Sequence, residues 1–531
     1  MSNSLGFNNF RKFQNFPSIN YTDITFLVGK NNSGKSTFVK ALVLFEQFLK
    51  SDDWSVFNFD NGVSDLINFT TYSRAINNMV SSRIHENFID FDYITDHYKF
   101  YLKITGDENK TVGDVIEFYF IDLRENFIFS YHPQSKQFII KNDSDYFHNQ
   151  RISIATNEAD LLSSRLQEIH SQIRMLKDHL LSVKDKFSIE FISAMEQKAK
   201  LELLYQKTLQ EYNIDLGKKA ESRFTFYLEF DIASSTPKDI FDEISTIASS
   251  AYKVSYNESQ VDSNIRKKDR EFENLRYFYQ NKRYFEFTFS KILDIISNKE
   301  YVYIHADIHR HLSLLPTRDK SNHLAQAVYA YSQLSIDGKA KCDRFISHWF
   351  RFFEIGDGIT VSIIEGDFAL VYVNQSERIS SQRQSPRLKT KMLLSDLGTG
   401  SIQVVKLIMQ LCVLLYDDKV NKKDCIVIIE EPEMNLHPKL QSQLCELFYN
   451  VSLLGVKLIV ETHSEYLIRN TQLFVKEKEL QIAPNENPFS VIYFDEDKIA
   501  WSMQYREDGK FKNEFGTGFF DESTNLAFEL L

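Results

Sequence analysis

The chain contains little glycine and proline, with 17 and 9 residues of these types among 531. Extended linkers are usually rich in glycine and serine or in proline, so this composition argues against a long low-complexity connector. The length predicts two or three domains with a large buried core. Hydrophobic residues make up 43% and charged residues 25% of the chain, as is usual for a soluble globular protein.

Cysteine is scarce too, and it forms no pattern that would bind a metal. The four cysteines are Cys342, Cys412, Cys425 and Cys445, with no CxxC pair and no histidines at metal-binding spacing. Cys412, Cys425 and Cys445 lie in apolar runs, so we expect them to be buried thiols in a reducing cytoplasm. The N-terminus lacks an apolar signal region, and no apolar run approaches the length of a membrane span. We therefore expect a cytoplasmic protein with no membrane partner.

The formal net charge of -11 argues against a protein covered by nucleic acid over its whole surface. A local basic groove remains compatible with this charge. One segment mixes basic and aromatic residues between Arg266 and Phe285. It could bind nucleic acid by phosphate contact and stacking, although an ordinary amphipathic helix explains the pattern more simply.

The first strong motif is GKNNSGKST at Gly29–Thr37, directly after the apolar run Ile24–Val28. It precedes a helix-like apolar pattern, and this strand–loop–helix context is that of a phosphate-binding P-loop. Its backbone N–H groups and the helix N-terminus favour phosphate, which predicts ATP and Mg²⁺ as ligands. The predicted nucleotide-binding residues are Gly29, Asn31, Asn32, Ser33, Gly34, Lys35, Ser36 and Thr37, with the Ser36 hydroxyl also on the metal.

A second apolar run, Cys425–Ile429, is typical of a strand buried on both faces and ends in Glu430 and Glu431. This is the arrangement of a Walker B motif. We assign Glu430 to the metal ion and Glu431 to the general base that polarises the attacking water. Taken alone, the run could simply be a strand that ends in solvated carboxylates, but the P-loop makes the catalytic interpretation much stronger.

Two further segments contain polar residues or glycines at the end of a strand or the start of a helix, where nucleotide sites often form. The strand-like run Lys457–Glu461 leads to His463, which could sense the γ-phosphate or could merely cap the next helix. Upstream, Ser395, Gly398 and Gly400 precede an apolar helix and could form an anion-binding nest or only an N-cap. Because the chain already has a P-loop, this second nest is useful if it completes the nucleotide site of a second copy.

Together these segments resemble the ATP-binding-cassette order, and more narrowly the group that contains RecF, SMC and OLD proteins. The resemblance is carried by Asn9–Phe13, the P-loop, IIEEPEMNLHP at Ile428–Pro438 and ETHSEYLI at Glu461–Ile468. The chain departs from that pattern with Glu430 in place of the usual aspartate. It also offers no evident Q-loop glutamine near Val63–Ile67. The resemblance implies an ATPase head that binds ATP at a dimer interface.

The end of the chain, Glu514–Glu522, is similar to the tail of ATPases from bacterial anti-phage systems of the Septu and retron types. That resemblance implies a homodimer or higher oligomer that regulates a partner effector such as a nuclease. The alternatives are a RecF-like DNA-binding ATPase of DNA repair and a non-hydrolysing scaffold. We find no nuclease centre, because Asp495–Asp497 lies between two strand-like runs and is better explained as a hairpin turn.

The fold class that follows is α/β, with a P-loop mixed sheet, an antiparallel β lobe and an inserted helical hairpin. Apolar residues from Leu162 to Phe187 alternate in spacings of four and three, which predicts a coiled-coil arm or else a pair of core helices. The predicted units are an N-terminal ATPase lobe at 1–150, the hairpin at 151–215, a mixed middle region at 216–385 and a C-terminal ATPase lobe at 386–531.

Overall fold

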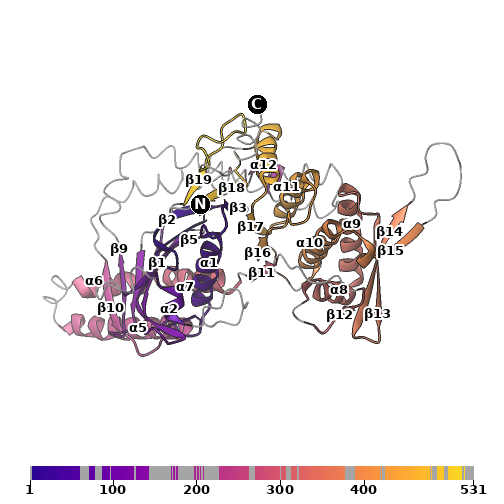
Figure 1. Ribbon diagram of the computed structural model, residues 1–531. Helices are drawn as coiled ribbons and strands as arrows, with labels where there is room; N and C mark the ends of the chain where they lie inside the picture. The colour runs from indigo at the N-terminus through magenta and orange to yellow at the C-terminus, as the bar shows by residue number, and fades with distance from the viewer. Residues whose placement is uncertain are drawn as a thin grey trace.

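The structure is a computed structural model of the 531-residue chain (Figure 1). It describes residues 3–59, 71–77, 87–95, 97–124, 127–142, 226–261, 270–298, 300–305, 313–319, 322–376, 389–418, 425–478, 487–495 and 500–516. A few isolated positions between 169 and 207, together with 420, 422, 480 and 520, complete the described part.

A six-stranded sheet forms the centre of the molecule, in the order β11-β16-β17-β3-β18-β19. All neighbouring strands are parallel except β18 and β19, which pair antiparallel. Both faces are covered, so β3 is buried throughout and its sequence is apolar apart from Thr25. The bounds are β3 Ile24–Gly29, β11 Glu300–Ile304, β16 Cys425–Glu430, β17 Lys457–Thr462, β18 Phe489–Phe494 and β19 Ala500–Met503.

The second sheet is antiparallel and has nine strands in the described part, ordered β10-β9-β8-β7-β6-β5-β1-β2 with β4 paired to β7. Burial alternates strictly along β6, as expected for a sheet with one face on the core. This confirms the predicted antiparallel lobe. The bounds are β1 Asn3–Phe10, β2 Phe13–Tyr21, β4 Val56–Asn58, β5 Ile89–Thr95, β6 Tyr98–Thr105, β7 Val112–Asp122, β8 Phe127–His132, β9 Gln137–Asn142 and β10 Tyr227–Asp231.

Two hydrophobic cores lie on opposite faces of the central sheet. The first joins that sheet to the antiparallel lobe and contains residues of α1, α2, α5, α6 and α7. It is rich in phenylalanine, and the rings of Phe7 and Phe16 stack with their centroids 4.4 Å apart. The bounds are α1 Lys35–Leu49, α2 Tyr72–Ala75, α5 Pro237–Val261, α6 Arg270–Gln280 and α7 Lys282–Asn298.

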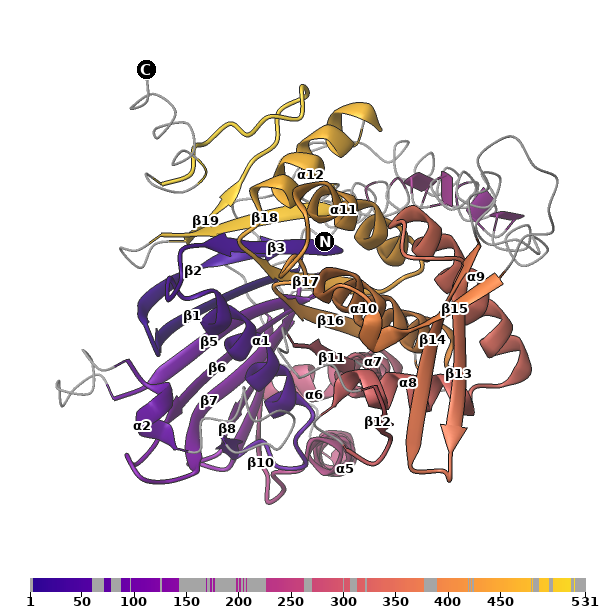
Figure 2. The same ribbon diagram turned by 45° about the vertical axis from the view of Figure 1, so that its right-hand side comes forward.

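The second core lies under α8 to α12 and a small antiparallel sheet formed by β12 to β15. Figure 2 shows these elements on the other side of the central strands from α1. The bounds are β12 Leu315–Pro316, α8 His323–Gln333, α9 Ile336–Phe352, β13 Gly358–Ile364, β14 Phe368–Ser376, β15 Lys389–Leu393, the short 3₁₀ helix η2 Leu394–Asp396, α10 Thr399–Tyr416, α11 Pro438–Leu453 and α12 Glu465–Glu477.

The range 216–385, which the sequence suggested as one region, contributes to three places. Its first part pairs β10 with β9 and packs α5 to α7 against the antiparallel lobe. Strand β11 joins the central sheet beside β16. The remainder, from β12 to β14, belongs to the second core.

The predicted hairpin at 151–215 lies largely outside the described residues. The parts that are described are helical, and Ile169 and Ile173 of the apolar seam are buried. The Val63–Ile67 region, the turn at 496–499 and most of the C-terminal tail also lie outside the described residues. The strands on either side of that turn, β18 and β19, do pair as a hairpin, as predicted.

Two phenylalanines of the basic and aromatic segment, Phe278 and Phe285, face the protein interior. Phe278 and Phe285 are buried and stack on each other with centroids 4.5 Å apart. Both rings are thus unavailable to nucleobases, which confirms the amphipathic-helix interpretation for α6 and α7. Tyr279, which is 41% exposed, remains on the surface.

Helix α10 is the one described helix that is long and apolar enough to cross a membrane, with a mean hydropathy of 1.5. Two thirds of it (67%) is already buried in the protein. Packing in the second core therefore accounts for its apolar sequence, as it does for the core helices of many soluble proteins.

All four cysteines are free and buried, which confirms the prediction made for Cys412, Cys425 and Cys445. Burial raises the pKa of Cys425 to about 12 and places those of Cys412 and Cys445 well above the ordinary value. Because the thiolate is the reactive form, we expect none of the four to react with Ellman's reagent in the folded protein. After denaturation in guanidinium all four should react, and rapid labelling of any cysteine in the native state would contradict this packing.

Candidate ATP-binding site

The P-loop connects β3 to α1 as predicted, and two of its glycines are required by their surroundings. Gly29 has φ of +148°, and a Cβ there would lie 2.3 Å from the carbonyl oxygen of Phe494 on β18. Gly34 has φ of +116°, and a Cβ would lie 2.5 Å from the Phe13 ring. Only glycine combines these backbone conformations with such close approach. The tight loop therefore depends on strands that are distant in sequence.

The Lys35 ammonium sits at the mouth of this loop, buried and fully engaged. It donates to the carbonyl oxygens of Gly29 and Lys30 at 3.0 Å each and to Nε2 of His463 at 3.2 Å. Because Nε2 accepts, the neutral His463 ring carries its proton on Nδ1. Burial and the nearby Lys35 lower the pKa of His463 to about 4, so the ring is neutral at physiological pH.

The loop and helix start line a cavity of about 510 Å³, which is large enough for a nucleotide. Predicted residues Asn31, Asn32, Ser33, Gly34, Lys35, Ser36 and Thr37 line it, together with Glu431 and His463. The buried Ser33 hydroxyl has no hydrogen-bond partner in the described part of the chain, as expected of a group that meets a phosphate.

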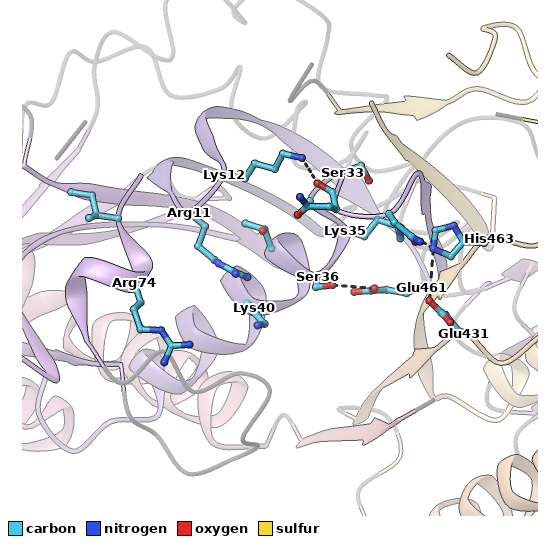
Figure 3. A pocket seen from close by; sticks show the side chains of 15 residues that line it. Arg11, Lys12, Ser33, Lys35, Ser36, Lys40, Arg74, Glu431, Glu461 and His463 are labelled. Atoms are coloured by element: carbon cyan, nitrogen blue, oxygen red, sulfur yellow. Dashed lines mark hydrogen bonds and ion pairs between the residues drawn. The ribbon is translucent and has the colours of Figure 1, made fainter. Parts of the chain in front are cut away.

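Basic side chains to which the sequence analysis gave no role in the site line one half of the cavity. They are Arg11, Lys12, Lys40 and Arg74. Figure 3 shows Arg11, Lys40 and Arg74 across the cavity from the carboxylates of Glu431 and Glu461. Lys12 donates to the carbonyl oxygen of Asn32 and so holds the P-loop. Burial, with Arg11 as the next cause, lowers the pKa of Lys40 to about 8. The cavity is thus polarised, with cations on one side and acids on the other, which suits a polyphosphate with its cation.

The carboxylates come from the ends of β16 and β17. Glu430 and Glu461 are paired residues of these parallel strands, so their side chains project to the same face. The residues two and four positions before Glu430, Ile428 and Ile426, belong to the core that contains α1. Both carboxylates therefore lie on the α1 side of the sheet, at the edge where the P-loop begins.

Glu431 follows β16 with φ of +39°, a strained conformation for a residue with a side chain. Its N–H donates to the carbonyl oxygen of Glu461, and its carboxylate Oε1 lies 3.8 Å from Nε2 of His463. The side chain is 43% exposed and lines the cavity. This position is suited to a base that accepts a proton from water.

His463 is held in place by hydrogen bonds to its backbone as well as to its ring. Its N–H donates to Oε1 of the buried Glu433 at 2.6 Å. The helix that follows is capped by Ser464, whose hydroxyl accepts from Leu467 N–H. The predicted alternative, in which His463 is itself the cap, is therefore wrong. Its ring is free to face Lys35 and Glu431.

Ser36 meets a carboxylate that the sequence analysis did not assign. Its hydroxyl donates to Oε2 of Glu461 at 3.2 Å (Figure 3). Glu461 is buried, and burial, together with Glu430, raises its pKa to about 7. Hard oxygen donors such as these are what Mg²⁺ binds, and one or two carboxylates beside nucleotide phosphates suffice. The residues that would hold Mg²⁺ are Ser36, Glu430 and Glu461.

Glu430 is held by Tyr303 of β11 and by His305, which directly follows that strand. The Tyr303 hydroxyl donates to its Oε1 at 2.5 Å, and Nδ1 of His305 lies 3.6 Å from its Oε2. His305 in turn accepts a hydrogen bond from Lys406 of α10 at its carbonyl oxygen. No local pattern around residue 303 revealed this role, because the contact spans 127 positions.

Ser395, Gly398 and Gly400 are not among the residues that line the cavity in the described part of the chain. They lie at η2 and the start of α10, in the second core's region, away from α1 (Figure 1). Ser395 accepts a hydrogen bond from Ser313, and Gly400 abuts the carbonyl oxygen of Asn435. The structure therefore brings the P-loop, Glu431 and His463 together at the cavity, but not this second nest. Glu430 is not among the lining residues and lies beside Glu461, which is.

A model of the family described as AAA ATPase domain matches residues 1–468, most of the chain. The chain belongs to this family. Membership of an ATPase family implies that the P-loop cavity takes a nucleotide, usually together with Mg²⁺. No curated protein matches the sequence.

Solved structures similar to the ATPase include SMC heads. One is the Smc head domain with an extended coiled coil bound to the C-terminal domain of ScpA from Pyrococcus furiosus, at 10% identity and a TM-score of 0.33, covering 99% of this chain and 98% of that one. Another is the SMC head domain from Thermotoga maritima, at 9% identity and a TM-score of 0.33, covering 95% and 100%.

The link from β11 to Glu430 leads to a prediction about catalysis. Tyr303→Phe removes the hydroxyl that orients Glu430, so we expect kcat for ATP to fall about tenfold with little change in nucleotide affinity. Steady-state kinetics over a range of Mg²⁺ concentrations measures both effects. Tyr329→Phe, at a 41% exposed tyrosine of α8, serves as the control. Unchanged kinetics in Tyr303→Phe would show that Glu430 needs no such support.

Proposed function

We propose that this ATPase hydrolyses ATP at an interface between two copies of the chain, and that its nucleotide state regulates a partner effector in anti-phage defence. The site residues act as assigned above, with ATP and Mg²⁺ bound. Glu431 takes a proton from the attacking water, and the products are ADP and inorganic phosphate. A cytoplasmic location and a nuclease as effector belong to the same proposal, as do the four units of the chain.

The observation that carries the dimeric site is the separation of the second nest from the P-loop. A loop with serine and glycines at a helix N-terminus favours an anion, yet Gly398 and Ser395 lie away from the cavity in their own chain. Ser395 is partly exposed, and a Cβ at Gly398 would meet nothing within 4 Å. An isologous pair of heads would bring each nest to the partner's P-loop, giving two composite sites.

A mixing experiment tests whether the site is composite. Gly398→Asp places a negative charge on the nest without a steric clash in its own chain, and Lys35→Ala disables the P-loop. We expect each variant alone to be inactive, while an equal mixture recovers about a quarter of the wild-type rate, because half of the dimers hold one intact site. Gly400 is unsuitable here, since a Cβ would lie 2.6 Å from the carbonyl oxygen of Asn435.

No recovery in the mixture, with both proteins folded, would contradict a composite site. An active Gly398→Asp protein would show that the nest is not used. The regulatory part of the proposal rests on the resemblance of the C-terminal tail. Its test is mass photometry of Glu431→Gln with ATP, alone and with the product of the adjacent gene. ATP-dependent capture of that product supports the proposal, whereas ATP-dependent binding to DNA alone would favour a RecF-like role.

A further inference from the structure

The two carboxylates that end β16 and β17 have different surroundings. Glu430 and Glu461 are register partners and project to the same face of the sheet. Conventional assignment by motif gives the cation to Glu430, since it stands at the Walker B position. The contacts of the four carboxylate oxygens support a different division of roles.

The oxygens of Glu430 face Tyr303 of β11 and His305, which directly follows that strand. Oε1 accepts from the Tyr303 hydroxyl at 2.5 Å, and Oε2 lies 3.6 Å from Nδ1 of His305. A carboxylate that already accepts a short hydrogen bond can still accept another from a water molecule. Its position beside the edge strand β11 nevertheless separates it from Ser36 by the width of β17.

The oxygens of Glu461 face the start of α1. Oε2 accepts from Ser36 at 3.2 Å, whereas Oε1 is buried and has no hydrogen-bond partner in the described part of the chain. The residue is only 6% exposed. An unpartnered buried carboxylate oxygen is costly, and the cost disappears when a cation or its bound water occupies that position.

We propose that Glu461, rather than Glu430, is the main protein carboxylate of the divalent-cation site beside Ser36. This inference rests on the proposed function, because the cation accompanies ATP in the P-loop cavity. Glu461 is placed there by β17, the strand between β16 and β3. Glu430, held by Tyr303, lies one strand further from Ser36 and then contacts the cation only through water.

The test is the gain in nucleotide affinity that Mg²⁺ provides, measured by calorimetry with a non-hydrolysable ATP analogue in Mg²⁺ and again in EDTA. The ratio of the two dissociation constants reports the coupling between cation and nucleotide without any turnover. We expect Glu461→Gln to lower this ratio by about tenfold, and Glu430→Gln by no more than about threefold. Glu507→Gln, at an exposed and distant position, should leave it unchanged.

A ratio in Glu461→Gln equal to that of the wild type would overturn the inference, as would a larger loss in Glu430→Gln. Binding of the analogue in EDTA shows whether each variant keeps an intact P-loop. If Glu461→Gln fails that check, Glu461→Asp replaces it, and a reduced ratio with normal binding in EDTA supports the inference. Failure of the wild-type protein to bind the analogue under any condition would instead refute the proposed ATPase function.

Discussion

We expect Glu431→Gln to lower the rate of ATP hydrolysis by about 100-fold or more while leaving ATP binding intact. Glutamine keeps the size of the side chain but cannot accept a proton from water. Glu431 is suited to that task because it lines the cavity and lies 3.8 Å from the neutral His463. Its strained backbone, with φ of +39°, is retained by glutamine at little extra cost.

The measurement is single-turnover hydrolysis together with equilibrium ATP binding by the same preparation. Because the variant binds ATP but turns it over slowly, we also expect it to accumulate as the proposed ATP-bound dimer. Glu507→Gln changes the net charge equally at an exposed position and should hydrolyse ATP at the wild-type rate. If Glu431→Gln kept its rate within about threefold of wild type, another group would have to be the base.

The parts of the site that could be predicted are those formed by short, contiguous sequence motifs. The P-loop is a strand, a turn and a helix start, and its chemistry is local to Gly29–Thr37. Glu430 and Glu431 follow a run that can only be a buried strand. In each case the local pattern predicts the element, although the tight P-loop also needs close contacts of Gly29 with Phe494 and of Gly34 with Phe13.

The parts that could not be predicted depend on how strands pair. Glu461 becomes a neighbour of Ser36 because β17 is inserted between β16 and β3, and nothing near residue 461 encodes that order. Tyr303 reaches Glu430 because β11 adds to the same edge, from 127 positions upstream. Parallel strands joined by long crossovers leave no sequence signature of register, so functional contacts between them appear only in the structure.

The basic side chains of the cavity could not be predicted from the sequence either. Arg11 lies in a turn, and its backbone N–H donates to the carbonyl oxygen of Ala75. This contact brings Arg74 to the same side of the cavity as Arg11. Sequence reasoning found a basic and aromatic segment near residue 280 instead, where Phe278 and Phe285 are core residues. Composition identifies charged segments, but only packing decides which of them face a ligand.

Lys35→Ala should have the largest effect on nucleotide binding, weakening ATP affinity by about 100-fold, or about 2.7 kcal/mol. A charged hydrogen bond to phosphate is worth about 1.5–3 kcal/mol, and the remaining basic residues of the cavity retain part of the affinity. Folding should not suffer. Burial lowers the pKa of Lys35, so the fold disfavours this charge, although its loss leaves Glu461 less compensated.

Calorimetry with ATP measures the affinity, and thermal unfolding without nucleotide separates binding from stability. We expect the melting temperature without ATP to stay close to that of the wild type, and the stabilisation by ATP to disappear at concentrations that saturate the wild type. Lys50→Ala, at an exposed lysine just after α1, removes the same charge and should change neither quantity. An affinity within about threefold of wild type would mean that Lys35 serves only to hold the loop through Gly29, Lys30 and His463.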